Sequence, residues 1–442
     1  MLDFFFGTDG VRGTPGTPPL DARTISMLGQ ALMQELGGTA RIVCGRDTRE
    51  SGIWIERHLA DGIRRAGGEL VSAGVIPTPG VALVTRQHEF DAGVVISASH
   101  NPFPDNGIKI LRSTGEKVTR QFESRIEARL GKLAGTSVGE ESVEVETRDF
   151  LETYVEHLFR VAGDTDLSAM RVAIDCAHGA MSGVAPRVLK KLGLVAIELN
   201  AKPDGKNINA KSGSTHPESL QKLVVEDGCH VGFAFDGDGD RVILVDQFGR
   251  LVDGDGVLFL VARHLKAAGT LVSDSIVATV MSNLGLEVAL LKCGIKLHRC
   301  PVGDLHVHEA MLHHRTCLGG EQSGHIIFSD LLPTGDGLGT AVSVLRILAE
   351  SGQRLDELLA DLSILPQVLV NVSVSRKPEL SEVPELLETI RSVEKSLNGR
   401  GRVLVRYSGT ESIFRIMLEG PEQEMIERMA GNIADSARLN LG

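Results

Sequence analysis

The sequence has no excess of positive charge and no long hydrophobic run, and each absence excludes a class of protein. Its 442 residues include 46 Lys and Arg against 58 Asp and Glu, which gives a formal net charge of −12. A chain this acidic lacks the cations that displace counterions from phosphates, so we expect no nucleic-acid partner. No stretch approaches the roughly 20 apolar residues of a membrane helix, so we expect no membrane partner.

The scarcity of cysteine and the first residues of the chain indicate a cytoplasmic protein. The spacings between the six cysteines do not repeat, and none of the cysteines forms a CxxC pair. This spacing predicts reduced, mostly buried thiols rather than a disulfide framework. The opening MLDFFFG contains neither a basic stretch nor a long apolar core, so we expect no signal peptide.

Length and composition are those of a globular chain with several domains and many loops. Domains of about 100–200 residues predict three or four in a chain of this length. The hydrophobic fraction is 42% and the charged fraction is 24%, which is typical of folded proteins. The 50 glycines exceed average use and indicate many tight loops, where functional residues often lie.

Strand-like and helix-like segments alternate along most of the chain. Apolar residues at helical spacing follow Asp21 and Ser51. Short apolar runs at residues 94–96, 172–174 and 276–278 predict strands between such helices. This alternation favours α/β domains with mixed or parallel sheets.

One arrangement recurs: a strand leads into a polar, glycine-containing loop, and a second strand leaves that loop. The loops span residues 97–107, 236–241 and 319–325. A strictly alternating strand at 368–374, a helix from Glu382, two more strands and a last helix from Pro421 then predict a smaller α+β domain. The predicted domains are 1–150, 151–252, 253–365 and 366–442.

The sharpest chemical feature is the acidic loop Asp236-Gly-Asp238-Gly-Asp240-Arg241. In an extended segment, residues two apart share a face, so the carboxylates converge and repel one another unless a cation neutralises them. Oxygen ligands of this kind suit Mg²⁺ or Ca²⁺. An EF-hand is excluded because Arg241 and Gln247 occupy positions that require Gly and Glu. A solvated acidic turn is the alternative.

The loop SASHNPFPDNGIK (97–109) places Ser99 beside His100. Adjacent side chains of an extended chain point apart, and the sequence has no GxSxG elbow, so we do not expect a hydrolase triad. A phosphorylated Ser99 would carry close to two negative charges and would need a cation, which the acidic loop can hold. Lys109 offers a further positive charge or a proton. A Ser/Asn/Pro-rich turn without chemistry is the alternative.

Two further loops carry groups that suit a sugar phosphate. The loop GGEQSGH (319–325) offers a carboxylate, an amide, a hydroxyl and an imidazole, which suit sugar hydroxyls. The loop RYSGTE (406–411), with Arg415 beyond it, combines backbone amides with guanidinium groups, which bind phosphate bidentately. Ordinary polar turns are the alternative for both loops.

Taken together, these motifs resemble the α-D-phosphohexomutase family over nearly the whole chain. In order, they are FGTDGVRG (6–13), GRDTRESG (45–52), SASHNPFPDNGIK (97–109), DGDGDR (236–241), GGEQSGH (319–325) and RYSGTE (406–411). The first motif and the GEQSGH form of the fifth are similar to the glucosamine branch rather than the mannose or glucose branches. Leu305 stands where relatives usually carry arginine, and Ser412 stands where they usually carry proline.

The resemblance implies a four-domain, heart-shaped α/β protein with three similar mixed-sheet domains and a smaller C-terminal α+β domain. It implies a cytoplasmic isomerase that converts glucosamine 6-phosphate to glucosamine 1-phosphate and feeds amino-sugar nucleotide and cell-wall precursor synthesis. A phosphoserine, bound Mg²⁺ and a glucosamine 1,6-bisphosphate intermediate belong to that reaction. The expected partner is a small hexosamine phosphate, and a homodimeric assembly stays open. The alternatives are a phosphomannomutase or phosphoglucomutase, a non-catalytic sugar-phosphate sensor, and a Mg²⁺-dependent phosphatase.

The resemblance also implies roles for individual residues. Ser99 is the phosphorylated serine and binds Mg²⁺ together with Asp236, Asp238 and Asp240. The other residues implied in catalysis are Arg12, His100, Lys109, Arg241 and His325. Those implied in substrate binding are Glu321 and Ser323 for the sugar, and Arg406, Ser408, Gly409, Thr410 and Arg415 for the phosphate that does not react.

Overall fold

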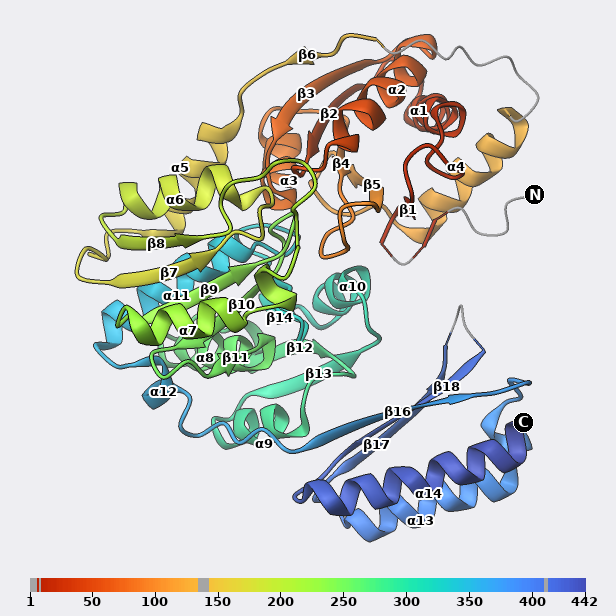
Figure 1. The fold of residues 1–442 in the computed structure, drawn as a ribbon, viewed down its shortest axis with the longest axis vertical. Coiled ribbons are helices and arrows are strands. Elements are labelled where there is room, and N and C mark those ends of the chain that lie inside the picture. Colours follow the sequence, from red (N-terminus) through yellow and green to blue (C-terminus); the bar gives the residue numbers. More distant parts are fainter. Residues whose placement is uncertain (1–5, 8, 134–142, 409–411) are drawn as a thin grey trace. The chain divides into compact units, whose positions relative to one another are not determined.

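The computed structural model describes residues 6–7, 9–133, 143–408 and 412–442 (Figure 1). Within these ranges the chain forms four β-sheets and divides into two compact units. The first unit holds residues 1–281 and 294–360, and the second holds residues 282–293 and 361–442. In the described part of the chain, no helix combines the length and the hydrophobicity that crossing a bilayer requires.

The first sheet is mixed, as the sequence predicts. Its strand order is β1-β5-β4-β2-β3-β6, with β4, β2, β3 and β6 parallel and β5 and β1 antiparallel to their neighbours. The strands are β1 (Val11–Gly13), β2 (Arg41–Arg46), β3 (Glu69–Val75), β4 (Ala92–Ile96), β5 (Asn106–Arg112) and β6 (Glu146–Thr147). The helices of this region are α1 (Ala22–Leu36), α2 (Ser51–Arg65), α3 (Thr78–Gln87) and α4 (Arg120–Leu133).

Helix α1 shows how local sequence sets these elements. The side chain of Asp21 accepts a hydrogen bond from Thr24 N at 3.0 Å and caps the helix, as predicted. Gly37 ends the helix with a φ of 94°, a backbone conformation that glycine adopts readily. Between these residues, the apolar face that includes Ile25 and Leu28 is buried in the core of this region.

The second and third sheets repeat the arrangement. Their orders are β11-β10-β9-β7-β8 and β13-β12-β14-β15, and β10 and β15 run antiparallel to the strands before them. The strands are β7 (Arg171–Asp175), β8 (Val195–Leu199), β9 (Val231–Phe235), β10 (Val242–Asp246), β11 (Leu251–Val252), β12 (Ser275–Thr279), β13 (Lys296–Cys300), β14 (Leu318–Gly320) and β15 (Ile326–Phe328). The helices are α5 (Leu151–Ala162), α6 (Met181–Lys191), α7 (Glu218–Glu226), α8 (Gly254–Ala267), α10 (Asp304–His314), α11 (Gly337–Ser351) and α12 (Leu355–Leu358).

The recurring strand–loop–strand arrangement is confirmed in all three sheets. The pairs β4–β5, β9–β10 and β14–β15 are antiparallel, and each pair encloses one of the predicted polar loops. In each region, the first strand of this pair therefore ends in a loop at which the chain reverses direction. The candidate site residues of the polar loops therefore lie at strand ends, where the sheet constrains the backbone conformation least.

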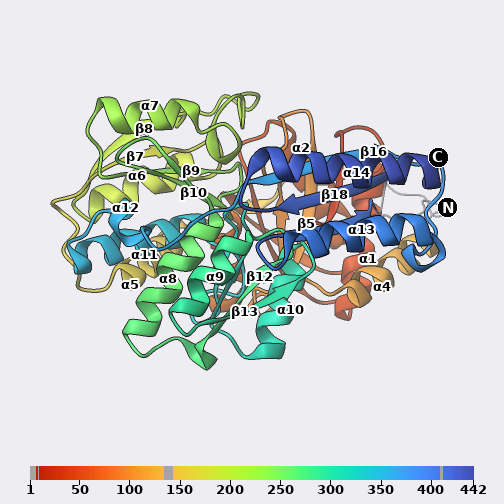
Figure 2. The same ribbon diagram turned by 90° about the horizontal axis from the view of Figure 1, so that it is seen from below.

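The second unit has the predicted α+β character. Its sheet has the order β16-β18-β17, with β16 (Gln367–Ser373), β17 (Arg402–Tyr407) and β18 (Ile413–Glu419) all antiparallel to their neighbours. Figures 1 and 2 show α13 (Pro384–Leu397) and α14 (Gln423–Leu441) side by side on one face of this sheet, where they enclose an apolar core. The unit also includes α9 (Leu284–Lys292).

Two predicted helix starts in this unit are wrong by a short distance. Helix α13 begins at Pro384 rather than Glu382, because proline fits the first turn of a helix and a short 3₁₀ turn precedes it. Helix α14 begins at Gln423 rather than Pro421, because Glu422 is still extended, with φ −134° and ψ 127°.

A buried polar cluster lies where α5 packs on α11 in the first unit. Tyr154 Oη donates to Asp336 Oδ1 at 2.6 Å, and Gly339 N donates to the same oxygen at 2.8 Å. Among the described residues, Asp336 Oδ2 and His157 Nε2 lack hydrogen-bond partners and lie 4.0 Å apart. Burial raises the pKa of Asp336 to about 6, although the bond from Tyr154 opposes this shift. Burial lowers the pKa of His157 to about 4.

Ionisation of the buried Asp336 carboxyl should destabilise the fold as pH rises, and we expect Asp336→Asn to remove this destabilisation. Because the folded pKa of Asp336 is raised from 3.8 to about 6, the folded protein binds the extra proton between these values. The protonated carboxyl stabilises the folded state. This stabilisation is complete below the pKa that Asp336 has in the unfolded chain, and it is lost as pH rises through the pKa of Asp336 in the folded protein. Asn keeps the Oδ1 acceptor without the buried charge. In urea unfolding, the variant should gain up to about 3 kcal/mol over wild type between about pH 4 and about pH 8.

The matched control is Asp21→Asn, which changes the half-buried cap of α1. Both variants replace a carboxylate with an amide, but only Asp336→Asn removes a buried carboxylate. A change in the pH dependence of stability that occurs only in Asp336→Asn is therefore due to burial of the charge. If the difference between Asp336→Asn and wild type stays constant across the pH range, the proposed role of the Asp336 charge is wrong.

Candidate active site

The loops after β4 and β9 bring Ser99 against the acidic triplet. Ser99 Oγ donates to Asp236 Oδ2 at 2.6 Å, although 137 positions separate the two residues. Carboxylate oxygens of Asp236, Asp238 and Asp240 lie within 4.8 Å of one another. All four side chains belong to buried residues, so solvent does little to screen the repulsion between the carboxylates.

The convergence of the carboxylates is as predicted, but its expected cause is wrong. Residues 237–240 form a turn rather than an extended segment, and Gly239 has a φ of 70°. Gly237 leaves room for the serine loop, since a Cβ at this position would lie 2.5 Å from Ser99 O. The glycines therefore set both the turn and the close approach of the two loops.

The expectation that Ser99 and His100 point apart is also wrong. Ser99 has a φ of 51°, in the left-handed region that is uncommon for residues other than glycine. This bend brings His100 Nδ1 to 3.4 Å from Ser99 Oγ. Burial, together with Arg241 and Arg12, lowers the pKa of His100 to about 4, so the ring is neutral near pH 7. Arg241 Nη1 lies 3.1 Å from the same nitrogen.

The residues of the triplet fit an oxygen-liganded cation. Asp238 Oδ1 and Asp240 Oδ1 are buried and, among the described residues, have no hydrogen-bond partner. Burial, and then repulsion from Asp240 and Asp238, raises the pKa of Asp236 well above its usual value. Lys109 Nζ lies 2.9 Å from Asp238 Oδ2 and 3.5 Å from Asp240 Oδ2 and offsets part of the charge. A small set of carboxylate oxygens and one hydroxyl is the donor set that Mg²⁺ prefers.

A chain of alternating charges extends from this site across the first unit. Lys109 Nζ lies 3.2 Å from Asp9 Oδ2, and Lys117 Nζ joins Asp9 to Asp304 Oδ2, the latter at 2.9 Å. Asp304 begins α10, so this chain links the first and third regions of the unit. Arg12 also pairs with Asp9 and donates to Asn101 Oδ1 at 3.2 Å.

The third polar loop adds a carboxylate and an imidazole. Glu321 is 9% exposed; its Oε1 accepts from Gly303 N at 2.9 Å, and its Oε2 accepts from Ser323 Oγ at 3.1 Å. His325 Nε2 accepts from Gly335 N at 3.1 Å, and its Nδ1 lies 3.7 Å from Asp240 Oδ2. His325 therefore contacts the acidic loop, whereas Glu321 and Ser323 contact each other.

The second unit carries its own cluster of positive charge. Strand register places Arg406 directly opposite Arg415 in the β17–β18 pair. Like charges opposite each other are unfavourable, which makes the pair suited to an anion. Ser408 is buried, and its carbonyl accepts from Lys377 Nζ at 2.7 Å. Gly409 and Thr410, the other predicted phosphate-binding residues, lie outside the described residues.

Sequence reasoning missed several side chains that hold these loops. Thr78 Oγ1 donates to Asp238 Oδ2 at 2.6 Å, and Thr78 N donates to Asp238 O at 2.9 Å. Arg49 and Asn209 both donate to the carbonyl of Ser99. Of these residues, only Arg49 lies in a motif, GRDTRESG, to which no role was assigned. No local pattern distinguishes Thr78 or Asn209.

Comparison with known proteins finds the same family along the whole chain. Profiles described as phosphoglucomutase/phosphomannomutase alpha/beta/alpha domains I, II and III, and as the C-terminal domain, match residues 3–135, 152–249, 253–364 and 369–436. A phosphoglucosamine mutase of Solibacter usitatus is 45% identical, with 100% of each chain covered. One of Symbiobacterium thermophilum is 46% identical, with 99% of each chain covered.

Solved structures agree on the fold. A phosphoglucomutase/phosphomannomutase family protein from Burkholderia thailandensis has a TM-score of 0.81 and 25% identity, covering 99% of this chain and 97% of its own. An N-acetylphosphoglucosamine mutase from Aspergillus fumigatus, solved with GlcNAc-6P and magnesium, has a TM-score of 0.69 and 19% identity, covering 99% and 96%.

We expect Asp240→Asn to weaken Mg²⁺ binding at least about 10-fold, because it removes an anionic oxygen from the triplet. Calorimetric titration with Mg²⁺ measures this affinity without any reaction. The matched control is Asp175→Asn, which changes another buried aspartate of the second sheet. Equal Mg²⁺ affinity in wild type and Asp240→Asn would contradict the assignment of Asp240 as a ligand.

Proposed function

The chain belongs to the phosphoglucomutase/phosphomannomutase family, and we propose that within it the protein interconverts glucosamine 6-phosphate and glucosamine 1-phosphate. The observation that carries this proposal is the 2.6 Å hydrogen bond from Ser99 Oγ to the buried acidic triplet. That contact puts a hydroxyl where a phosphoryl group can be neutralised. The choice of sugar is supported by the full-length similarity to phosphoglucosamine mutases.

In the first half-reaction, phosphorylated Ser99 donates its phosphoryl group to O1 of glucosamine 6-phosphate. The bond from phosphorus to Ser99 Oγ breaks, a bond from phosphorus to O1 forms, and the proton of the O1 hydroxyl replaces the phosphoryl group on Ser99. The product is glucosamine 1,6-bisphosphate. Phosphoryl transfer of this kind depends mainly on positioning and on stabilising negative charge.

In the second half-reaction, the bisphosphate turns so that its 6-phosphate faces Ser99. The phosphoryl group returns to Ser99 Oγ, the proton of the serine moves to O6, and glucosamine 1-phosphate is released. Each half-reaction leaves one phosphate that does not react. We assign it to Arg406, Ser408, Gly409, Thr410 and Arg415, and the pairing of Arg406 with Arg415 in the register of β17 and β18 supports this assignment.

The remaining residues act through charge and orientation. Lys109, a buried cation beside Asp238, offsets charge as phosphoryl oxygens approach, and Arg241 and Arg12 contribute positive charge around the neutral His100. His325 orients Asp240, and Glu321 and Ser323 bind the sugar. Asp236, Asp238, Asp240 and the phosphoserine would hold Mg²⁺, which neutralises phosphate charge when bound. The cytoplasmic location and the domain boundaries stay predictions.

We expect Ser99→Ala to lower turnover by at least about 10²–10³-fold, because it removes the phosphoryl carrier. Intact mass before and after phosphatase treatment should show one phosphate lost from wild type and none from the variant. Peptide mapping should place that phosphate within residues 97–107. Near-normal turnover in Ser99→Ala would contradict the mechanism.

We expect kcat/KM to be highest for glucosamine 6-phosphate when it is compared with mannose 6-phosphate and glucose 6-phosphate on the same enzyme preparation. A higher kcat/KM for either neutral sugar would assign the protein to that branch instead. Release of inorganic phosphate without isomerisation would indicate a phosphatase.

A further inference from the structure

One buried arginine binds the whole turn that carries Ser99. The side chain of Arg49 is fully buried, and an arginine offers five N–H donors. All of them are used: Nε donates to Asp47 Oδ2 at 2.9 Å, Nη1 donates to Pro102 O and Asp105 O, and Nη2 donates to Ser99 O and Asn101 O. The guanidinium thus binds four carbonyls of one loop.

The backbone N–H of Ser99 is also connected to Arg49, through Ser97 and Asp47. Ser99 N donates to Ser97 Oγ at 2.9 Å, and Ser97 Oγ donates to Asp47 Oδ2 at 2.6 Å. That carboxylate oxygen also accepts from Arg49 Nε. Both peptide groups that flank the Ser99 side chain are therefore connected to the Arg49–Asp47 pair.

A second side chain reaches the same carbonyls from another region of the unit. Asn209 lies after β8, and its Nδ2 donates to Ser99 O at 2.8 Å and to Asn101 O at 2.9 Å. Arg49 Nη2 donates to these two oxygens at 3.1 and 2.7 Å. Two segments, one that follows β2 and one that follows β8, therefore hold the same pair of carbonyls.

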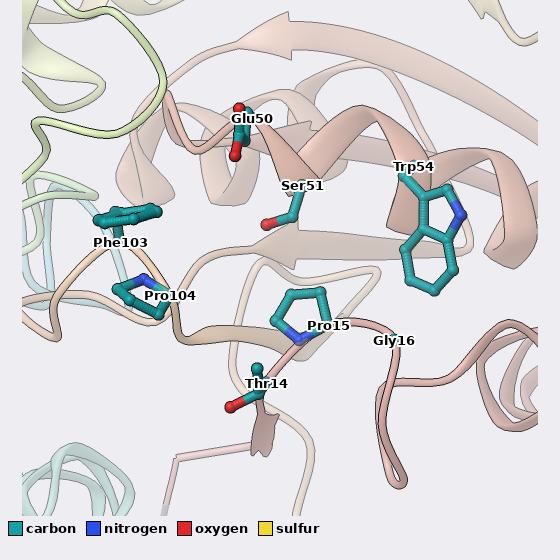
Figure 3. A pocket seen from close by; sticks show the side chains of 8 residues that line it. All are labelled: Thr14, Pro15, Gly16, Glu50, Ser51, Trp54, Phe103 and Pro104. Carbon is teal, nitrogen blue, oxygen red and sulfur yellow. The ribbon is translucent and has the colours of Figure 1, made fainter.

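Residues 102–104, on the outer side of this loop, are exposed. Phe103 and Pro104 border a cavity of about 510 Å³ that Trp54 and Pro15 also line (Figure 3). Phe103 is 37% exposed. Ser99 also keeps its uncommon φ of 51°, a conformation that persists only where the surroundings enforce it. The hydrogen bonds from Arg49 and Asn209 to the carbonyl of Ser99 are part of those surroundings.

We propose that Arg49 and Asn209 are positioning residues for phosphoryl transfer: they hold the carbonyls of Ser99 and Asn101 and so aim Ser99 Oγ at the acidic triplet. The proposal rests on the function proposed above. It explains why an arginine stands at position 49, since a lysine keeps the charge beside Asp47 but has no planar fork to span several carbonyls.

The kinetic test compares Arg49→Lys, Asn209→Ala and the double variant with wild type. A misplaced nucleophile lowers kcat, whereas sugar-phosphate binding elsewhere leaves KM within about 3-fold. We expect kcat to fall about 10²-fold in Arg49→Lys and about 10-fold in Asn209→Ala. Because both side chains hold the same carbonyls, the double variant should lose less than the product of the single losses.

The matched control is Arg46→Lys, which makes the same change three positions earlier. Arg46 Nε lies 3.7 Å from Glu56 Oε2, so this arginine is paired with α2 rather than with the serine loop. Its kcat should stay within about 2-fold of wild type. An equal loss of kcat in Arg46→Lys and Arg49→Lys would overturn the proposal.

Amide hydrogen exchange provides a readout that does not depend on the substrate. Exchange in the peptide covering residues 97–107 should become at least about 10-fold faster in Arg49→Lys and Asn209→Ala, while β9 exchanges as in wild type. Unchanged exchange at 97–107 would overturn the proposal. If Arg49→Lys fails to fold, Asn209→Ala alone decides by the same criteria. If the wild-type protein is inactive on glucosamine phosphates, the proposed function is wrong. The hydrogen-exchange result would then still decide whether Arg49 and Asn209 hold the serine loop.

Discussion

Three carboxylates and one hydroxyl lie together in a buried site, and repulsion between the carboxylates is the constraint on which the rest of the first unit depends. Asp236, Asp238 and Asp240 lie within 4.8 Å of one another, and Ser99 Oγ binds the first of them. Burial makes their mutual repulsion expensive unless positive charge is close. Lys109 supplies part of that charge, and the triplet oxygens that have no hydrogen-bond partner within the described ranges are suited to a divalent cation. The same need for positive charge makes the site able to accept a phosphoryl group on the serine.

The fold meets this requirement with repeated geometry. In each of the first three sheets, one parallel strand ends in a polar loop, and an antiparallel strand leads away from it. Two of these loops meet directly at Ser99 and Asp236, and the third reaches the acidic loop through His325. Lys117 bridges Asp9 and Asp304, which adds an ionic connection between the first and third regions. The site therefore depends on three regions folding and packing together.

Order within the loops comes from backbone features as much as from side chains. Ser99 adopts a left-handed φ, Gly239 turns the acidic loop, and Gly237 permits the close approach of the two loops. The conformation of Ser99 is unfavourable in isolation and needs support from its surroundings. Arg49 and Asn209 supply that support through the carbonyls of the serine loop. In the proposed mechanism, a nucleophile held this firmly loses little entropy when phosphoryl transfer begins.

Much of the fold could be read from the chain because hydrophobic period and capping are local properties. Asp21 capping α1, the short buried strands and the alternating β16 are examples. Motif order likewise identified the serine loop and the acidic loop. The conformation inside those loops does not follow from local pattern. The alternating aspartates predict an extended segment where a turn exists, and extended-chain geometry predicts that His100 faces away from Ser99.

The sequence by itself determined which groups are available: one serine, three alternating carboxylates, and the arginines and lysines that accompany them. Only the tertiary structure decided which of them meet. Thr78, Lys117 and Asn209 join the site from positions with no motif, because their contacts depend on how separate sheets pack rather than on neighbouring residues. The order of residues along the chain sets local conformational preferences. Burial, charge pairing and the conformation of the loops are decided only when segments distant in the sequence pack against one another.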